Sequence, residues 1–414
     1  MDSDVRSLLV SQCGGERCRT PGGRRSAAVT FSRSLWTICA LIGSLIWPGA
    51  PLMASADVQF AGYAVTGDAV GANASVQVLM PLTQGDAAIA ANQHLYQSIL
   101  QQGPTAIALK ADGLAALDGS TSAIVVAAAI DRESVLVEQV GSDFKLVAEI
   151  AGQALFFDFR EKQVIASVPV TVEHIDVVQH EPTAEDRAGA LRRLFQNPGE
   201  NGFSAAMARA IASVRLPGPA ARRLQLTEVT VAEGALAERP LLEARVDSGV
   251  IGHEFSKHFS AGTGLALLPF RSGQAIGGAM AARFADGRVY SLKIPEADYA
   301  IRLRIDRIAQ RPIEQTAALE RRLYGVFFHI IVEEPLSGRR YLDQSLRQGA
   351  TKLIPASQTV VDDEAAYYDT LMEAFANVAA ASQGHADNWI AEQPGGRDAR
   401  RQWNDFKELI EQCR

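Results

Sequence analysis

The sequence has few cysteines and lacks a hydrophobic run of membrane-spanning length. Three of its four cysteines, Cys13, Cys18 and Cys39, lie within the first 56 of 414 residues. If those 56 residues are removed after synthesis, Cys413 is left alone, which excludes an internal disulfide. The most apolar stretch, residues 35–47, would rise only about 20 Å as a helix, less than the roughly 30 Å of a hydrocarbon core.

Positive charge is also scarce. The chain holds 40 Lys and Arg against 47 Asp and Glu, which gives a net charge of −7 at pH 7. Its pairs of neighbouring arginines are scattered and have no aromatic residues among them, so we expect no nucleic-acid binding. With 47% hydrophobic residues and ordinary glycine and proline content, the composition is globular and excludes a disordered or collagen-like chain.

The first 56 residues have the features of a secretory leader. Arg25 and Arg33 precede the apolar run of residues 35–47, and a small-residue stretch follows that ends in Ala54-Ser55-Ala56. A positive flank, a short apolar segment and an Ala-x-Ala pattern predict a signal peptide over residues 1–56 that is cleaved at its end. We therefore expect a periplasmic protein of a bacterium, with no integral membrane segment after cleavage.

Two alternatives stay open for this leader. The apolar segment could remain uncut as a membrane anchor. Translation could also begin at Val29 rather than Met1, through a non-AUG codon, because residues 1–28 are polar and unlike a signal peptide. A start at Val29 would leave a leader of ordinary length.

The sequence contains no catalytic, cofactor or metal motif that we recognise. The segment His253-Glu254-Phe255-Ser256-Lys257-His258 resembles a zinc-protease motif, but its histidines stand about 140° apart on a helix and cannot bind one ion together. We predict that this segment is solvated surface. His329, inside an apolar strand, is predicted to be a hydrogen-bonded core residue. The sequence thus predicts no catalytic residues, no cofactor, no metal and a non-enzymatic role.

Changes in the hydrophobic period divide the rest of the chain. Strand-like runs and helix-like segments predict an α+β fold with two α/β domains, each a mostly antiparallel sheet flanked by helices. The predicted parts are the leader 1–56, a first α/β domain 57–182, a helical connection 183–223, a second α/β domain 224–383 and a C-terminal helical tail 384–414.

Several segments carry specific predictions. Ser75–Leu82 is β-prone and predicts a strand, and Tyr299–Ile308 alternates between apolar and charged residues as a half-buried strand does. Leu323–Val332 is nearly all apolar and predicts an interior strand covered on both faces. Ala123–Val170 and Tyr299–Leu346 share the order of an Ile-Asp-Arg segment, a Phe-Phe segment and a returning strand. This order indicates an internal duplication, although any three-strand meander would look similar.

Residues 249–383 resemble a known family. A helix over Gly252–Phe259 leads to Gly264-Leu265-Ala266-Leu267-Leu268-Pro269, then Ala297-Asp298-Tyr299 opens a strand, and Pro335-Leu336-Ser337-Gly338-Arg339 precedes a returning strand. This order is similar to the small α/β domain shared by the curli-secretion lipoprotein family and the TolB amino-terminal domain. The lipidated cysteine and an evident pore hairpin are missing here. The resemblance implies an envelope assembly or scaffolding domain, and self-association with it.

The sequence therefore favours an exported, non-enzymatic envelope protein that binds other envelope proteins, with homo-oligomerisation as an option. Trp403, Phe406 and Ile410, on one side of the last helix, are the candidate partner-binding residues, and packing on their own domain is the alternative. Two other functions stay open. One is a periplasmic protein that binds a solute or a glycan, and the less favoured one is a hydrolase that combines distant residues such as His253, His258 and Asp247.

Overall fold

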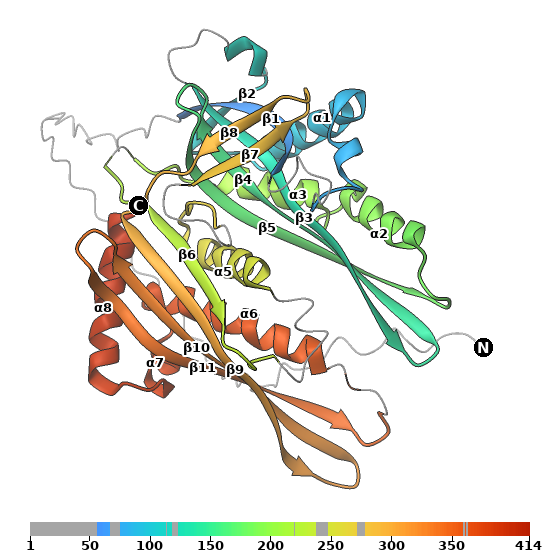
Figure 1. Cartoon of the computed structure of the whole chain (residues 1–414), viewed down its shortest axis with the longest axis vertical. Coiled ribbons are helices and arrows are strands. Elements are labelled where there is room, and N and C mark those ends of the chain that lie inside the picture. Colours follow the sequence, from blue (N-terminus) through green and yellow to red (C-terminus); the bar gives the residue numbers. More distant parts are fainter. Residues whose placement is uncertain are drawn as a thin grey trace, which may run out of the picture. The chain divides into compact units, whose positions relative to one another are not determined.

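Long antiparallel strands run through both sheets of the fold (Figure 1). The computed structural model describes residues 56–66, 75–112, 114–117, 123–218, 220–236, 247–270, 278–358, 361 and 363–414. In these residues the strands form one seven-stranded and one four-stranded sheet, and seven α-helices accompany them. The predicted α+β class is thereby confirmed. The predicted leader lies outside the described residues except for its last residue, Ala56.

The first sheet closes on itself. Its strand order is β2-β1-β3-β4-β5-β8-β7, and β1 also pairs with β7. Val125, Phe157 and Phe284 belong to one apolar cluster of this sheet and are at most 1% exposed. The strands are β1 (Ala56–Thr66), β2 (Ile107–Lys110), β3 (Ile124–Val140), β4 (Asp143–Asp158), β5 (Gln163–Val178), β7 (Ala279–Phe284) and β8 (Val289–Lys293).

Helices pack on the other face of this sheet, where Val126 and Phe156 share an apolar cluster with helical side chains. The second of these helices begins after Thr183, whose side chain forms a capping box with Asp186. The helices are α1 (Gly85–Gln101), α2 (Ala184–Gln196) and α3 (Phe203–Ser213), and short 3-10 turns lie at Met80–Leu82 and Leu114–Leu117.

The second sheet has the order β11-β10-β9-β6, with β6 parallel to β9 and the other pairs antiparallel. Helices α5, α6 and α8 share one large apolar core with it. The elements are β6 (Leu224–Val231), β9 (Tyr299–Gln315), β10 (Leu319–Glu334), β11 (Arg339–Pro355), α5 (Ser248–Thr263), α6 (Asp363–Ser382), α7 (Asp387–Glu392) and α8 (Gly396–Gln412).

Both sheets contain a parallel pair followed by two antiparallel pairings. In the first sheet these strands are β1, β3, β4 and β5, and in the second they are β6, β9, β10 and β11. The internal duplication stays a prediction, as do the domain boundaries at residues 182, 223 and 383. The hairpin of β7 and β8 lies within the predicted second domain but pairs with β1 and β5 of the first sheet.

The strand predicted over Ser75–Leu82 is wrong. Residues 75–79 form bends and Met80–Leu82 a 3-10 turn. One carboxylate holds this segment, because Glu133 accepts hydrogen bonds from the backbone N–H groups of Gln77 and Leu79, at 2.7 and 2.9 Å, and from that of Val78. A β-prone local sequence is thus overridden by a carboxylate from a distant strand.

The prediction that Leu323–Val332 is covered on both faces is also wrong. Val326, Phe328 and Ile330 are fully buried in the core, whereas Leu323 and Phe327 are only half-buried. The segment is therefore a strand with one buried face and one open face. The prediction was wrong because large apolar residues occur on both faces of this strand, as they do in a strand that is covered on both sides. We call this open face the outer face of the second sheet.

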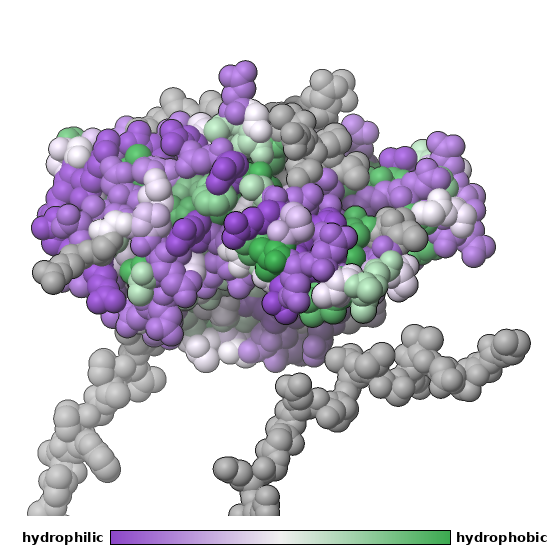
Figure 2. Space-filling view, turned by 90° about the horizontal axis from the view of Figure 1, so that it is seen from below, coloured by the Kyte–Doolittle hydropathy of each residue, from purple (hydrophilic) through white to green (hydrophobic). Residues whose placement is uncertain are grey.

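Large hydrophobic side chains are exposed on several strands and helices. Seen from below, hydrophobic surface forms separate patches among hydrophilic residues (Figure 2). In the described part of the chain no helix has both the length and the apolar character needed to cross a membrane. The exposed side chains include Ile89, Val140, Ile175, Val177, Ile313, Leu336 and Leu353.

Candidate functional site: an arginine-lined groove

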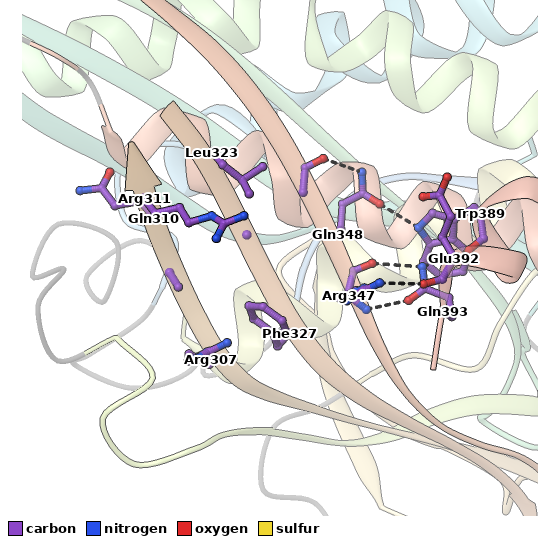
Figure 3. A pocket seen from close by; sticks show the side chains of 13 residues that line it. Arg307, Gln310, Arg311, Leu323, Phe327, Arg347, Gln348, Trp389, Glu392 and Gln393 are labelled. Atoms are coloured by element: carbon purple, nitrogen blue, oxygen red, sulfur yellow. Dashed lines mark hydrogen bonds between the residues drawn. The ribbon is translucent and has the colours of Figure 1, made fainter. Parts of the chain in front are cut away.

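A groove of about 600 Å³ lies over β9, β10 and β11, next to α7 (Figure 3). This volume is within the range of small-molecule sites, which is about 300–1,000 Å³. Its lining comes from the middle of three long strands and from one short helix. The residues are Arg307, Ala309, Gln310, Arg311, Leu323, Gly325, Phe327, Arg347, Gln348, Gly349, Trp389, Glu392 and Gln393.

Two glycines keep the floor of the groove low. Gly325 of β10 pairs directly with Gly349 of β11 and, on its other side, with Ala309 of β9. A β-carbon on Gly325 would meet Phe327 Cε2 at 3.6 Å, and one on Gly349 would meet Leu323 Cδ1 at 3.4 Å, which are ordinary contacts. The fold therefore has room for larger side chains at both positions. Glycine inside a strand weakens it, and it often marks a bulge, a bend or the close approach of a ligand or another backbone.

Larger side chains stand in rows on either side of this floor. Phe327 lies directly between Arg307 of β9 and Arg347 of β11, and Leu323 lies opposite Arg311. The Arg307 guanidinium carbon is 4.3 Å from the centre of the Phe327 ring, a cation–π contact. Figure 3 shows Phe327 between the two arginines. The groove thus has an apolar floor with cationic groups at its edges.

The arginines of the groove differ from their neighbours on the same sheet. Arg302 and Arg304 form ion pairs with Glu333 at 2.9 Å and with Asp306 at 2.6 Å. In the described part of the chain no ion pair joins a carboxylate to the lining arginines 307, 311 and 347. Among the described residues of the lining, Glu392 alone contributes a carboxylate against these three guanidinium groups. The groove is therefore a site of excess positive charge in a chain whose net charge is −7, and it suits an anion.

Helix α7 forms one wall of the groove and is fastened to the edge of β11. Gln393 Oε1 accepts from the backbone N–H of Arg347 at 2.9 Å, and the Arg347 guanidinium donates to the Glu392 carbonyl at 3.1 Å. Trp389 Nε1 donates to Gln348 Oε1 at 2.8 Å. These bonds, drawn in Figure 3, hold the wall in place and orient Arg347 without neutralising it.

The structure places the candidate partner-binding residues inside the core of the second sheet. Trp403, Phe406 and Ile410 are 3%, 0% and 0% exposed. The Phe406 ring stacks on Phe259 of α5 at 6.0 Å, and Trp403 meets Trp389 of the groove wall edge-on at 6.2 Å. Their burial agrees with packing on their own core, the alternative that the sequence left open, and a partner-binding role stays a prediction. Through this contact between Trp403 and Trp389, helix α8 packs against the helix that forms the wall of the groove.

The segment predicted as solvated surface around Glu254 is part of α5 and packs against β5, so that prediction is wrong. Glu254 is fully buried, accepts a 2.6 Å bond from Thr171 Oγ1 and pairs with Lys257. His253 Nε2 lies 3.2 Å from the Val170 carbonyl, and His258 is half-buried. The described residues contain no group of three or more side chains suited to a metal ion.

Burial and charge set the ionisation of this cluster. Burial alone would raise the pKa of the Glu254 carboxyl, but the charge of Lys257 and the hydrogen bonds from Lys257 and Thr171 outweigh it, and the pKa lies below its ordinary value. Burial lowers the pKa of His253 below 6.5, against the attraction of Glu254. Burial and the charge of Lys257 also lower the pKa of His258. Both histidines are therefore neutral in the folded protein near neutral pH.

We expect the protein to lose stability as the pH falls from 7.5 to 5.5. The unfolded chain binds protons at both histidines near pH 6.5, whereas the folded chain, with lowered histidine pKa values, does not. Acid therefore favours unfolding in this window. Urea-unfolding midpoints of the wild type and of His253→Gln, which can still donate to Val170, measure the effect. The variant should show the smaller decrease, and a wild-type midpoint that is constant or rises at pH 5.5 would contradict this.

His329 is hydrogen-bonded as predicted, but its predicted place in the core is wrong. It lies on the outer face, with Nε2 at 2.9 Å from Asp343 Oδ1 and Nδ1 at 3.0 Å from Ser345 Oγ. Serine, histidine and aspartate are the residue types of a hydrolase triad. Here they are cross-strand neighbours, because His329 lies opposite Ser345 in the register. The three residues therefore form a polar contact between β10 and β11, next to the groove.

Comparisons with known proteins add little to this geometry. No family model and no curated protein matches the chain. Matching solved structures include a DUF330 protein from Xanthomonas campestris, 14% identical, covering 40% of this chain and 89% of that one with a TM-score of 0.21. They also include a candidate lipoprotein from Caulobacter crescentus, 17% identical, covering 41% and 93% with a TM-score of 0.20. Scores this low carry no argument, and the resemblance of residues 249–383 stays a prediction.

Proposed function

We propose that this is an exported, non-enzymatic protein of the cell envelope that binds an anionic small molecule in the groove of the second sheet. The observation that carries the proposal is the Gly325–Gly349 pair, which leaves an apolar floor between three arginines. Nothing in the local packing requires glycine at these positions. The weakness that glycine brings to the two strands is explained if a ligand approaches the backbone there.

The electrostatics support an anion rather than a neutral ligand. Arg307 and Arg347 are exposed, and each is oriented by an uncharged partner, the Phe327 ring and the Glu392 carbonyl. Both guanidinium groups are therefore held in place by uncharged partners, and their positive charges can bind an anion. A carboxylate, sulfonate or phosphate would form charge-assisted hydrogen bonds with them, which are about twice as strong as neutral ones.

The proposed location rests on the leader. The basic flank, the apolar run of residues 35–47 and Ala54-Ser55-Ala56 are the parts of a cleavable signal peptide. Amino-terminal sequencing of the protein recovered from the periplasmic fraction tests this. A chain that begins near Asp57 supports export, and a chain recovered only in the cytosol with residues 29–56 intact contradicts it.

Fluorescence titration with 1-anilinonaphthalene-8-sulfonate tests the binding site. This probe joins an aromatic body to one sulfonate. We expect saturable binding by the wild type, weakened about a hundredfold by Arg307→Gln combined with Arg347→Gln, because two charge-assisted contacts are lost. The control is Arg304→Gln, on the same strand but paired with Asp306 and outside the lining. Equal affinity of all three proteins would overturn the proposal.

The alternative of an assembly or scaffolding module stays a prediction from the sequence. Its candidate residues, Trp403, Phe406 and Ile410, are buried in this structure. The alternative of a solute-binding or glycan-binding protein agrees better with a groove of about 600 Å³ that has polar edges. We therefore place the binding of a small ligand first.

A further inference from the structure

We infer that the ligand carries acidic groups at two separate points, joined by a slender uncharged spacer that crosses the glycine floor. This inference rests on the proposed function, since it names the class of molecule that the same groove takes. Its basis is the arrangement of cationic side chains on both sides of a row that is free of large ones.

One end of the groove is an oriented anion site. Arg307 stacks on Phe327, and Arg347 is bonded to the Glu392 carbonyl. Since Phe327 separates them in the register, the two backbones are about 10 Å apart, two strand spacings. Two arginine side chains can reach one acidic group across that distance. The ring between them supplies an apolar contact for the atoms next to that group.

The other end of the groove holds a single cation. Arg311 is four residues from Arg307 on the same strand and the same face, about 13 Å along the strand. Its exposed side chain stands opposite Leu323. Arg311 is thus separated from Arg307 and Arg347 by the row of Ala309, Gly325 and Gly349. It is placed to bind a second acidic group.

The floor between the two ends determines the spacer. The row of Ala309, Gly325 and Gly349 offers backbone and a single methyl group. Phe327 and Leu323 bound the row on its two sides. A spacer that lies on this row must be slender and without charge. A short alkyl chain and the carbon–hydrogen face of a sugar both meet this requirement, so the shared chemistry is a two-headed acid.

Displacement of 1-anilinonaphthalene-8-sulfonate by matched acids tests the inference. Decanoate and decanedioate differ by one carboxylate, and galacturonate and digalacturonate provide the sugar counterpart. We expect at least one two-headed acid to bind about tenfold more tightly than its one-headed partner, the effect of one added charge-assisted contact. The tighter of the two identifies the spacer as alkyl or saccharide.

Arg311→Gln provides the decisive variant. It should remove the advantage of the two-headed acid and leave the one-headed acid within about twofold, since only the second acidic group reaches Arg311. Arg304→Gln, the paired arginine of the same strand, should change neither. The inference is overturned if one-headed and two-headed acids bind equally, or if Arg311→Gln weakens both by the same factor.

The same experiment separates this inference from the proposed function. If the fluorescent probe binds in the groove and Gly349→Val abolishes its binding, while the acids show no two-headed advantage, only the inference fails. If Gly349→Val leaves the binding of the probe unchanged, the proposed function fails.

Discussion

Valine at position 349 is expected to abolish ligand binding in the groove while the protein stays folded. Gly349 lies in the middle of β11 with extended backbone, and a β-carbon there meets Leu323 Cδ1 at 3.4 Å. The valine methyl groups would fill the space that a ligand needs above Gly325. Because valine suits a strand better than glycine, the free energy of unfolding should rise by about 0.5–1 kcal/mol.

Titration with 1-anilinonaphthalene-8-sulfonate and urea unfolding measure the two effects. Gly325→Val should behave in the same way, since it fills the groove from the neighbouring strand. The matched control is Ser345→Thr, which adds a methyl group on the same strand and face, keeps the hydroxyl that contacts His329 and lies outside the lining. Probe binding by the glycine variants with wild-type affinity would show that the groove is not the site.

Alanine at position 406 is expected to destabilise the protein by about 3–5 kcal/mol, the usual cost of removing a buried phenylalanine. Phe406 is fully buried and contacts the rings of Phe259 and Trp403. Its loss would leave a cavity at the junction of α5 and α8. Urea unfolding at pH 7.5 measures the change.

Glu408→Ala is the matched control for this effect. Glu408 lies two residues further on the same helix and is exposed, so its replacement should change the free energy of unfolding by less than about 0.5 kcal/mol. If Phe406→Ala were as stable as the control, the residue would not belong to the core. The partner-binding role predicted from the sequence would then be the better account of it.

Local patterns in the sequence were sufficient to predict many of the elements. Leu224–Val231 alternates between apolar and polar residues, which predicts the strand that is observed over the same residues. Tyr299–Ile308 alternates as expected, with Ile301, Leu303 and Ile305 on the buried side. The apolar stripe of residues 368–378, with acidic residues before it, predicts a helix over residues 362–380, and the structure has one at Asp363–Ser382. These elements follow from side-chain period alone, and period is a property of neighbouring residues.

Contacts between distant residues could not be predicted in this way. The groove depends on the register that brings Gly325 opposite Gly349, and on α7 reaching the edge of β11. The sequence gives one indication of the groove, a glycine inside the nearly all apolar run of residues 323–332. The burial of Glu254 likewise depends on two partners, Lys257 and Thr171. Lys257 lies in the same segment, but Thr171 is distant in the sequence and could not be predicted as a partner.

The structure also explains why the predicted solvated segment is buried. A histidine or a carboxylate in a helix is usually exposed, and its burial requires partners. Here β5 supplies them, since the Val170 carbonyl and the Thr171 hydroxyl face α5. On the outer face of the second sheet, Arg302 and Arg304 form ion pairs with carboxylates. In the described residues no such pair forms with the arginines of the groove.

A crystal structure of the protein with 1-anilinonaphthalene-8-sulfonate tests the central claim most directly. We expect the naphthalene over Gly325 and Gly349 and the sulfonate within hydrogen-bond distance of Arg307 or Arg347. A complex in which the probe occupies another surface while the groove holds only solvent would contradict this account.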